Sequence, residues 1–301
     1  MATAIEASGL TKYYGDSPGI IDLDLEVTVG EVYGFLGPNG AGKSTTIRTL
    51  LNLLFPTSGS AKVLGLDIIK DSLEIRRRTG YLPGEMAMYG AMTAQEYLIY
   101  FANLRSVNAD AKMKELADRF ELDLNRRIKD YSTGNRQKIG LVNAFMHEPE
   151  LLVLDEPTSG LDPLMQQEFQ ELVIETRAEG KTVFLSSHIL PEVERVADRV
   201  GIVREQHLIA VDTVEAFKAK AHRSVTIQFD RSIDPAPFAR LESVVSVETR
   251  NDKSVLVLTV QGGMDQVIKE AASHQVVSVS TRSGELEEVF LSYYAGTHDA
   301  P

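Results

Sequence analysis

The sequence predicts an α/β domain built on a mostly parallel sheet, followed by a smaller α+β domain. Short apolar segments typical of buried strands alternate with segments of helical periodicity over most of the chain. This alternation favours a parallel sheet that is covered by helices on both faces. After about residue 219 the order changes to β-α-β-β-α-β, the order of a ferredoxin-like split unit. We therefore expect two domains, residues 1–218 and 219–301.

Composition limits the classes of function. The chain has 301 residues, 43% of them hydrophobic, which is enough to bury one large core or two modest ones. Its formal net charge is −12, and an acidic surface repels phosphate backbones, so we expect no nucleic acid partner. The absence of cysteine excludes disulfides, thiolate metal sites and cysteine nucleophiles. The apolar runs are too short to cross a bilayer, and the first residues lack the features of a secretion signal.

The elements of the first domain follow from their hydrophobic periods. Residues 21–29 alternate apolar and polar side chains, which predicts a half-buried strand, and residues 32–36 form a short apolar strand before a glycine-rich turn. A helix follows, with apolar residues at helical spacing over 47–54, and the turn residues 56–59 end it. The remaining predicted elements are helices within 93–146, a buried strand at 151–154, a helix at 165–178 and a buried strand at 182–186.

The second domain is predicted from shorter segments. Its expected elements are a strand at 225–229, a short helix at 235–241, two hairpin strands at 243–249 and 254–260, a helix at 265–273 and a strand at 276–281. Asn251 and Asp252 form the turn of the hairpin. We also expect a closing helix at 285–294 and a loose tail at 297–301. No motif in this domain carries chemistry, so we expect a dimerisation or packing module, with ligand sensing as the alternative.

A phosphate-loop pattern, G-x-x-x-x-G-K-[ST], is fitted by one segment, Gly37-Pro38-Asn39-Gly40-Ala41-Gly42-Lys43-Ser44. Its glycines let the backbone curl so that several N–H groups face one phosphate, and the following helix adds the positive end of its dipole. Lys43 supplies a full positive charge to the terminal phosphates. The hydroxyl of Ser44 can coordinate Mg²⁺, and Thr45 lies beside it. The segment, with a strand before it and a helix after it, indicates a nucleoside triphosphate site.

Two acidic residues, Asp155 and Glu156, follow the predicted strand 151–154. An acidic side chain at the carboxyl end of a buried parallel strand points into the crevice where ligands bind. Asp155 is suited to hold Mg²⁺, directly or through water. Glu156 is placed to orient or deprotonate an attacking water. Combined with the phosphate loop, this pair favours hydrolysis of the triphosphate over binding alone.

Further segments, together with these two motifs, resemble the nucleotide-binding subunit of ABC transporters over residues 1–218. The segments are Thr11-Lys12-Tyr13-Tyr14-Gly15, Tyr131-Ser132-Thr133-Gly134-Asn135-Arg136-Gln137-Lys138, Ser159-Gly160-Leu161-Asp162 and His188. The resemblance implies a P-loop NTPase fold of the ABC type with a helical subdomain, and it implies ATP and Mg²⁺ as cofactors. It also implies that two copies, as a homodimer, sandwich two ATP molecules, each between one copy's phosphate loop and the other's Ser132 segment.

The resemblance assigns roles at the nucleotide. Tyr14 would stack on the adenine, with Tyr13 as a rival for that role. Ser132 and Gly134 would contact the γ-phosphate bound by the other subunit, helped by the N-terminus of a helix that begins near Asn135. Ser132 also suits a simpler role as a helix cap.

The resemblance also assigns roles in hydrolysis and in the dimer interface. Lys43, Glu156 and His188 would be the catalytic residues, with His188 clamping the γ-phosphate and the attacking water. Asp162 would communicate across the interface between subunits, although Asp162-Pro163 is also a common start of a helix. With Glu156 and His188 both retained, the resemblance implies ATP hydrolysis.

Two segments depart from the family pattern. The family's signature usually reads Leu-Ser-Gly-Gly-Gln, whereas this chain has Tyr-Ser-Thr-Gly-Asn at 131–135 and keeps only the serine and the second glycine. Where the family has a glutamine that reaches towards Mg²⁺ and water, this chain has Gly84, which has no side chain. Glu85 could replace that glutamine as a metal ligand after a shift of one residue, or a water could fill the gap.

The sequence is similar to that of the exporter branch called ABC-2 or daunorubicin-resistance-like in four segments, 80–85, 132–140, 155–163 and 286–290. That branch also has an added C-terminal domain. That similarity implies a peripheral ATPase on the cytoplasmic face of the cell membrane. It would power export of a drug, antibiotic, lipid or polysaccharide through a separate integral membrane permease, which residues 86–120 would contact. A non-transport ABC ATPase of another cytoplasmic machine, an importer ATPase and an ATP-sensing module are the alternatives.

Overall fold

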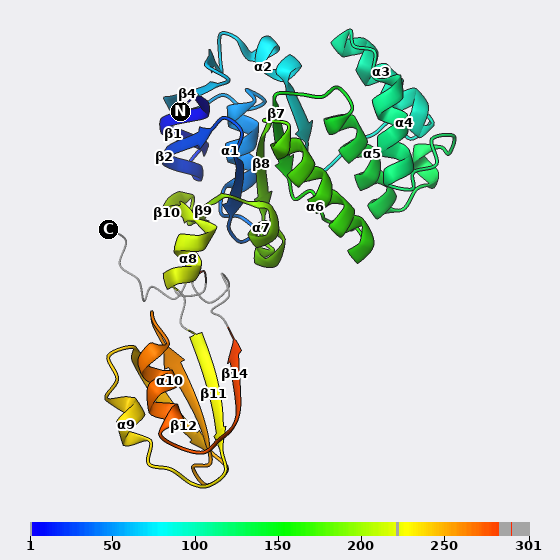
Figure 1. The fold of residues 1–301 in the computed structure, drawn as a ribbon. Coiled ribbons are helices and arrows are strands. Elements are labelled where there is room, and N and C mark those ends of the chain that lie inside the picture. The colour runs from blue at the N-terminus through cyan, green and yellow to red at the C-terminus, as the bar shows by residue number, and fades with distance from the viewer. Residues whose placement is uncertain (1, 221–222, 283–289, 291–301) are drawn as a thin grey trace. The chain divides into compact units, whose positions relative to one another are not determined.

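The structure, a computed structural model, describes residues 2–220, 223–282 and 290 (Figure 1). The chain divides into two compact units, Met1–Val211 and Asp212–Pro301. The domain boundary expected after residue 218 falls within helix α8 (Val214–Lys220) and stays a prediction. The closing helix expected at 285–294, apart from Phe290, and the tail expected at 297–301 lie outside the described residues.

The first unit holds two sheets. An antiparallel sheet has the order β2-β1-β4-β5, and a six-stranded sheet has the order β10-β9-β3-β8-β7-β6. Within the larger sheet, β3 runs parallel to β8 and β9, and β7 runs parallel to β6 and β8. The strands are β1 (Thr3–Tyr14), β2 (Ser17–Thr28), β3 (Val32–Leu36), β4 (Ser58–Val63), β5 (Leu66–Asp67), β6 (Thr79–Leu82), β7 (Leu151–Asp155), β8 (Thr182–Ser187), β9 (Arg199–Arg204) and β10 (His207–Thr213).

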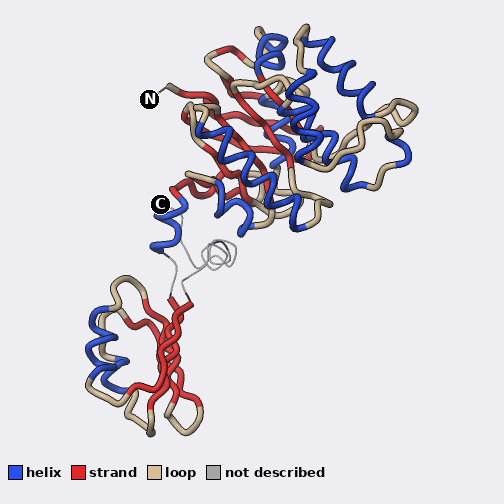
Figure 2. The backbone as a smooth tube through the Cα atoms, turned by 45° about the vertical axis from the view of Figure 1, so that its right-hand side comes forward, coloured by secondary structure: helices blue, strands red, loops and turns tan. Residues whose placement is uncertain are grey.

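Helices cover both faces of the larger sheet, as Figures 1 and 2 show. The helices of this unit are α1 (Lys43–Leu50), α2 (Ser72–Arg78), α3 (Ala94–Arg105), α4 (Asp110–Arg119), the short 3-10 helix η1 (Ile128–Asp130), α5 (Thr133–Phe145), α6 (Pro163–Ala178) and α7 (Leu190–Val196). Because side chains alternate along a strand, Tyr33 and Phe35 of β3 join the core that contains α1. Gly34 between them faces α7, where an added Cβ would lie 2.2 Å from Val193 Cγ1. The predicted mostly parallel sheet with helices on both faces is confirmed.

The prediction for the first helix was wrong at its C-terminus, because α1 ends at Leu50 and not at Leu54. Asn52 adopts a left-handed conformation with φ 52°, which asparagine tolerates better than most residues. The backbone N–H groups of Leu53 and Leu54 then turn back to the carbonyl oxygen of Arg48, at 2.8 and 3.1 Å. The helix therefore ends about one turn before Leu54, its expected last residue.

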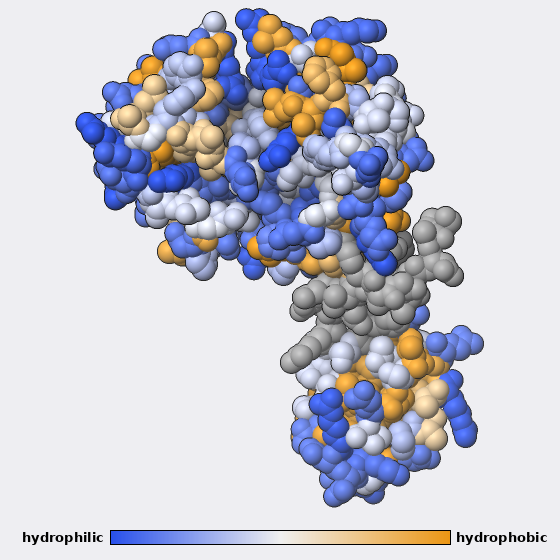
Figure 3. Space-filling view, turned by 180° about the vertical axis from the view of Figure 1, so that it is seen from behind, coloured by the Kyte–Doolittle hydropathy of each residue, from blue (hydrophilic) through white to orange (hydrophobic). Residues whose placement is uncertain are grey.

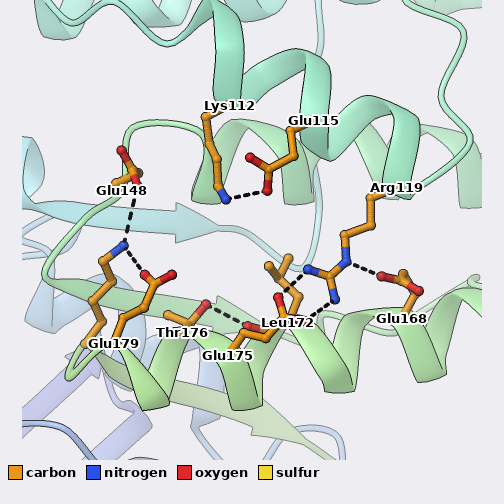
Figure 4. Close-up of polar contacts among 10 residues, drawn as sticks. Lys112, Glu115, Arg119, Glu148, Glu168, Leu172, Glu175, Thr176 and Glu179 are labelled. Atoms are coloured by element: carbon orange, nitrogen blue, oxygen red, sulfur yellow. Dashed lines mark hydrogen bonds and ion pairs between the residues drawn. The ribbon is translucent and has the colours of Figure 1, made fainter.

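The helices predicted within 93–146 are confirmed as α3, α4, η1 and α5. A capping box starts α3, since the hydroxyl of Thr93 accepts from the N–H of Glu96 and the Glu96 carboxylate accepts from the N–H of Thr93. Figure 4 shows Arg119 on α4 pointing towards Glu168 and Glu175 on α6. The guanidinium donates to both carboxylates, with a distance of 3.0 Å from Nη2 to Glu175 Oε1. Ion pairs from Arg119 to two glutamates therefore connect the helical region to α6.

The second unit has the predicted β-α-β-β-α-β order with antiparallel pairing between neighbouring strands. Its sheet has the order β12-β13-β11-β14. The elements are α8, β11 (Arg223–Phe229), α9 (Ala236–Ala239), β12 (Val244–Arg250), β13 (Val255–Val260), α10 (Asp265–Ala272) and β14 (Val276–Arg282). Alternate residues of β11 and β13 form the core with Phe238 and Val267 from the helices. The predicted ferredoxin-like order is confirmed.

Apolar side chains remain on the surface of this second unit. The large ones are Val245, Ile268, Val277 and Val279, each more than half exposed. Figure 3 shows apolar patches among hydrophilic side chains on one face of the unit. Among the described residues of the whole chain, no helix combines the length and the apolar character that crossing a bilayer requires.

Candidate active site

The phosphate loop connects β3 to α1, which begins at Lys43. Gly40 and Gly42 have φ values of 83° and 106°, which disfavour any side chain. A Cβ added at Gly42 would lie 2.4 Å from the carbonyl oxygen of Gly19 on β2. Glycine at position 42 is therefore required both by the backbone conformation and by the neighbouring strand. The N–H groups at the start of α1 have no partner within the helix and can face an anion.

A cavity lies in front of this loop. The residues that line it are Tyr14, Pro18, Gly19, Pro38, Asn39, Gly40, Gly42, Lys43, Ser44, Thr45 and Glu156. Most of them are predicted nucleotide-binding residues, whereas Pro18 and Gly19 on β2 were missed. A Cβ at Gly19 would lie 2.8 Å from both Tyr14 and Thr45. This close approach is a tertiary feature, so neither residue stands in a motif that the sequence could reveal.

Tyr14 and Tyr13 are separated by the structure. The Tyr14 side chain lines the cavity, and its hydroxyl lies 3.3 Å from Thr45 Oγ1. The ammonium of Lys12 lies over the Tyr14 ring, 5.6 Å from its centre. Tyr13 is not among the described residues that line the cavity, and its N–H donates to Thr57 Oγ1. The geometry favours Tyr14 as the residue that meets a base.

Glu156 stands between Lys43 and His188. Its Oε1 lies 3.1 Å from Lys43 Nζ, and its Oε2 lies 2.7 Å from His188 Nδ1. The backbone of Glu156 has φ 50°, a conformation that costs a glutamate free energy and that clusters at functional sites. Lys43 also donates to the carbonyl oxygens of Gly37 and Pro38, at 2.6 and 3.2 Å. The three predicted catalytic residues therefore form one connected group, in which Lys43 and Glu156 line the cavity and His188 is not among the described lining residues.

Asp155 is fully buried at the end of β7. Ser186 on β8 donates its hydroxyl to Asp155 Oδ1 at 2.6 Å, whereas Oδ2 has no hydrogen-bond partner among the described residues. A buried carboxylate oxygen without a partner is costly, so it suits a bound cation or its water. Ser44 lines the cavity, whereas Asp155 is not among the described residues that line it. The carboxylate and hydroxyl oxygens of these two residues are ligand types that fit Mg²⁺.

Gly84 approaches this free oxygen. A Cβ added at Gly84 would lie 3.2 Å from Asp155 Oδ2, so the position that lacks a side chain is next to the proposed metal ligand. Glu85 is exposed and is not among the described residues that line the cavity. Its assignment as a metal ligand gains no support from this geometry and stays a prediction.

The other predicted site residues lie at two helix starts outside the lining of this cavity. Ser132 is the N-cap of α5, where its hydroxyl accepts from the N–H of Asn135 at 3.3 Å. Asp162 is the N-cap of α6, where its carboxylate accepts from two N–H groups at 3.1 Å. Gly134 packs against Gly160, whose carbonyl oxygen would lie 2.3 Å from an added Cβ. Both cap roles are therefore present, and both segments lie against each other within one chain.

Other polar residues that were given no role complete the surroundings of Glu156. Gln137, 4% exposed, donates its amide to the carbonyl oxygens of Glu156 and Pro157. Thr158 donates its hydroxyl to Glu192 on α7. Burial is the main cause that raises the pKa of Glu192, and the neighbouring Glu156 carboxylate adds to the effect. Gln137 stands inside the signature segment, but its spacing gives no sign of these contacts.

Comparison with known proteins agrees with this geometry. A family model described as ABC transporter matches residues 20–159. The bacitracin transport ATP-binding protein BcrA of Bacillus licheniformis is 33% identical, with 98% of this chain and 99% of the relative covered. The daunorubicin/doxorubicin resistance ATP-binding protein DrrA of Streptomyces peucetius is 34% identical over 96% of this chain and 92% of its own length.

Solved structures show the same fold for the first unit. The structure of an ATP-binding subunit of an ABC transporter superposes with a TM-score of 0.68 at 31% identity, covering 72% of this chain and 92% of that one. The dimeric structure of MJ0796, a bacterial ABC transporter cassette, gives a TM-score of 0.65 at 21% identity, covering 70% of this chain and 98% of that one. The similarity to MJ0796, at 21% identity, shows the fold alone.

Proposed function

This chain belongs to the ABC transporter ATP-binding family and is an ATPase, and from that premise we propose that it powers export through a separate membrane subunit. The relatives that match nearly the whole chain are named for bacitracin transport and for daunorubicin and doxorubicin resistance. For this protein we propose that the exported cargo is a drug, an antibiotic, a lipid or a polysaccharide. The chain would act on the cytoplasmic face of the cell membrane, with residues 86–120 against the permease.

The observation that carries the chemistry is the placing of the Glu156 carboxylate between Lys43 and His188 at the phosphate-loop cavity. The loop N–H groups would bind the phosphates of ATP, and the charge of these phosphates would attract Lys43 away from Glu156. The freed carboxylate would then orient the attacking water and accept its proton. His188, hydrogen-bonded to Glu156, would hold that carboxylate and reach the γ-phosphate. Tyr14 would stack on the adenine.

Mg²⁺ would lie beside the phosphates. Ser44 and Asp155 would hold it, since the hydroxyl lines the cavity and Asp155 Oδ2 is buried without a partner among the described residues. When bound, the ion supplies positive charge to the phosphate oxygens. Ser186 keeps the Asp155 carboxylate oriented through Oδ1. Gly84 lies next to Oδ2 and offers the ion no side chain.

The site would be completed by a second copy. Ser132, Gly134 and Asp162 lie outside the lining of the cavity of their own chain, and a helix N-terminus such as that of α5 suits a phosphate from another molecule. We propose a homodimer in which this segment closes over the partner's ATP. The added domain, expected at 219–301, would support that dimer.

The proposal is tested by purifying the full chain from its own membranes and identifying the integral membrane protein that stays with it. We expect one permease subunit, and the reconstituted pair should move a cargo outwards from the ATP side in vesicles. Cargo movement towards the ATP side would make the chain an importer ATPase. Copurification with ribosomes or another cytoplasmic machine, and no membrane protein, would contradict the transport function.

A further inference from the structure

We propose that Gln137 is a positioning residue that fixes the backbone of Glu156 and links the start of α5 to hydrolysis. This inference rests on the proposed function, because it takes Glu156 as the group that activates water. Gln137 does not touch the nucleotide cavity, since it is not among the described residues that line it. It acts through the peptide groups on either side of Pro157.

The contacts of Gln137 are directed at that backbone. Its Nε2 donates to the carbonyl oxygen of Glu156 at 3.2 Å and to that of Pro157 at 2.9 Å. An amide nitrogen carries two N–H donors, so one side chain satisfies both carbonyls. The residue is 4% exposed, so water cannot easily replace these bonds. Removing the donor would take a partner from both carbonyl oxygens, although that of Glu156 would keep its bond from the N–H of Ser159 at 3.2 Å.

Glu156 needs such support because its backbone is unfavourable. Its φ of 50° lies in the left-handed region, which persists only where the surroundings hold it. On the amino side, the N–H of Glu156 donates to the carbonyl oxygen of Ser186 at 3.2 Å. On the carboxyl side, the carbonyl oxygen of Glu156 accepts from the Gln137 amide and from the N–H of Ser159, each at 3.2 Å. Hydrogen bonds with β8 and with α5 therefore both fix the backbone of Glu156, and the direction of its side chain depends on both.

Helix α5 reaches two functional places within one chain. Its N-cap, Ser132, begins the segment proposed to meet the partner's ATP, and Gln137 lies about 7 Å further along the helix axis. Gly134 on the same turn packs against the backbone of Gly160, which follows Glu156 in the chain. Docking of a second copy on the start of α5 would therefore act on the helix that orients Glu156. Gln137 thus joins the two half-sites of each chain.

The test uses Gln137→Met, which keeps length and volume but has no donor. In the full-length protein we expect kcat to fall roughly 10- to 100-fold, the loss that a small displacement of a catalytic group produces. The Kd for ATP should stay within about twofold of wild type, because the phosphate loop does not use Gln137. The ATP-stabilised dimer should persist longer than in wild type, since hydrolysis releases it.

Gln170→Met is the matched control. Gln170 is also buried, at 8% exposure, but lies on α6, where its Oε1 accepts from Arg195. We expect this variant to lose thermal stability while kcat stays near wild type. Equal losses of kcat in both variants, or full turnover in Gln137→Met, would overturn the proposal.

A second variant keeps the test decisive if Gln137→Met does not fold. Gln137→Glu can donate to these carbonyls only when its carboxyl is protonated, so its kcat relative to wild type should rise as pH falls. A ratio that does not change with pH would contradict the positioning role. Full turnover in Glu156→Gln would instead refute the role of Glu156 in the proposed function, whatever Gln137 does.

Discussion

The ammonium of Lys43 lies 3.1 Å from Oε1 of Glu156, across the phosphate-loop cavity. Both side chains are largely buried, at 5% and 20% exposure, so this ion pair is screened less than one at the surface. A triphosphate would offer Lys43 a stronger partner than a single carboxylate. Binding of ATP is therefore expected to separate the pair and free Glu156 for water.

Lys43→Met should weaken ATP binding roughly 10- to 100-fold, because it removes a charged donor worth about 1.5–3 kcal/mol to the phosphates. Titration of the purified chain with a fluorescent ATP analogue measures the change in Kd. Lys62→Met, on an exposed position of β4, is the control and should bind as wild type does. Unchanged binding by the Lys43 variant would contradict the assignment of the loop.

Tyr14→Ala should raise the Kd for ATP roughly 5- to 100-fold, since aromatic stacking on a base is worth about 1–3 kcal/mol. Tyr14→Phe keeps the ring and should bind nearly normally. Tyr13→Ala is the matched control, because Tyr13 is not among the described lining residues. A larger loss in the Tyr13 variant, measured in the same titration, would exchange the two roles.

Gly134→Ala should lower ATPase turnover on the order of 10-fold or more while leaving ATP binding to the monomer intact. The added Cβ would lie 2.3 Å from the carbonyl oxygen of Gly160, so the backbone of one segment must move. Gly263→Ala is the control, because no atom lies within 4 Å of its added Cβ. Normal turnover and normal ATP-driven dimerisation in the Gly134 variant would argue against a shared site.

His147 should make the fold sensitive to acid. Burial lowers its pKa from 6.5 to about 4, and the guanidinium of Arg105 adds to the effect. The folded state therefore binds this proton less readily than the unfolded chain does. The resulting stability is complete above about pH 6.5 and is lost as pH falls from 6.5 towards 4, by on the order of 3 kcal/mol.

His147→Gln removes that titration. The difference in unfolding free energy between pH 7 and pH 4, from urea denaturation, should shrink by on the order of 3 kcal/mol relative to wild type. Between pH 7 and pH 8 the two proteins should change alike, since His147 is neutral in both states there. An identical loss of stability on acidification in both proteins would contradict the prediction.

The sequence predicts well where a local pattern has one geometric solution. The phosphate loop needs a strand before it and a helix after it, and β3 and α1 stand there. The short apolar segments at 151–154 and 182–186 were likewise correctly predicted as buried strands, and they correspond to β7 and β8 of the parallel sheet. The end of α1 was missed because Asn52 closes the helix through its own backbone conformation, a choice that apolar spacing does not record.

The antiparallel sheet was harder to predict. Along β1 the register against β2 shifts at several places between Thr3 and Tyr13, so the alternation that marks a half-buried strand is broken. The strand β1 was therefore not predicted, and β4 was also missed, although a strand at the place of β2 was predicted. The cavity residues Pro18 and Gly19 were missed with them, because their place follows from that sheet.

The contacts around Glu156 depend on residues far apart in the chain. Gln137 lies 19 positions before the carbonyl that it holds, and Ser186 lies 30 positions after the N–H that it accepts from. From residue types and the order of the motifs, Lys43, Glu156 and His188 could be predicted as one catalytic group. The contacts that hold the glutamate backbone in place, from Gln137 and Ser186, become visible only in the folded structure.

The most direct test of the central claim is the ATPase rate of Glu156→Gln, measured with the oligomeric state in the presence of ATP and Mg²⁺. The amide keeps the shape of the side chain but cannot accept the proton of the attacking water. We predict that turnover is lost while an ATP-stabilised dimer accumulates. Undiminished turnover, or loss of ATP binding together with turnover, would contradict the role given to Glu156.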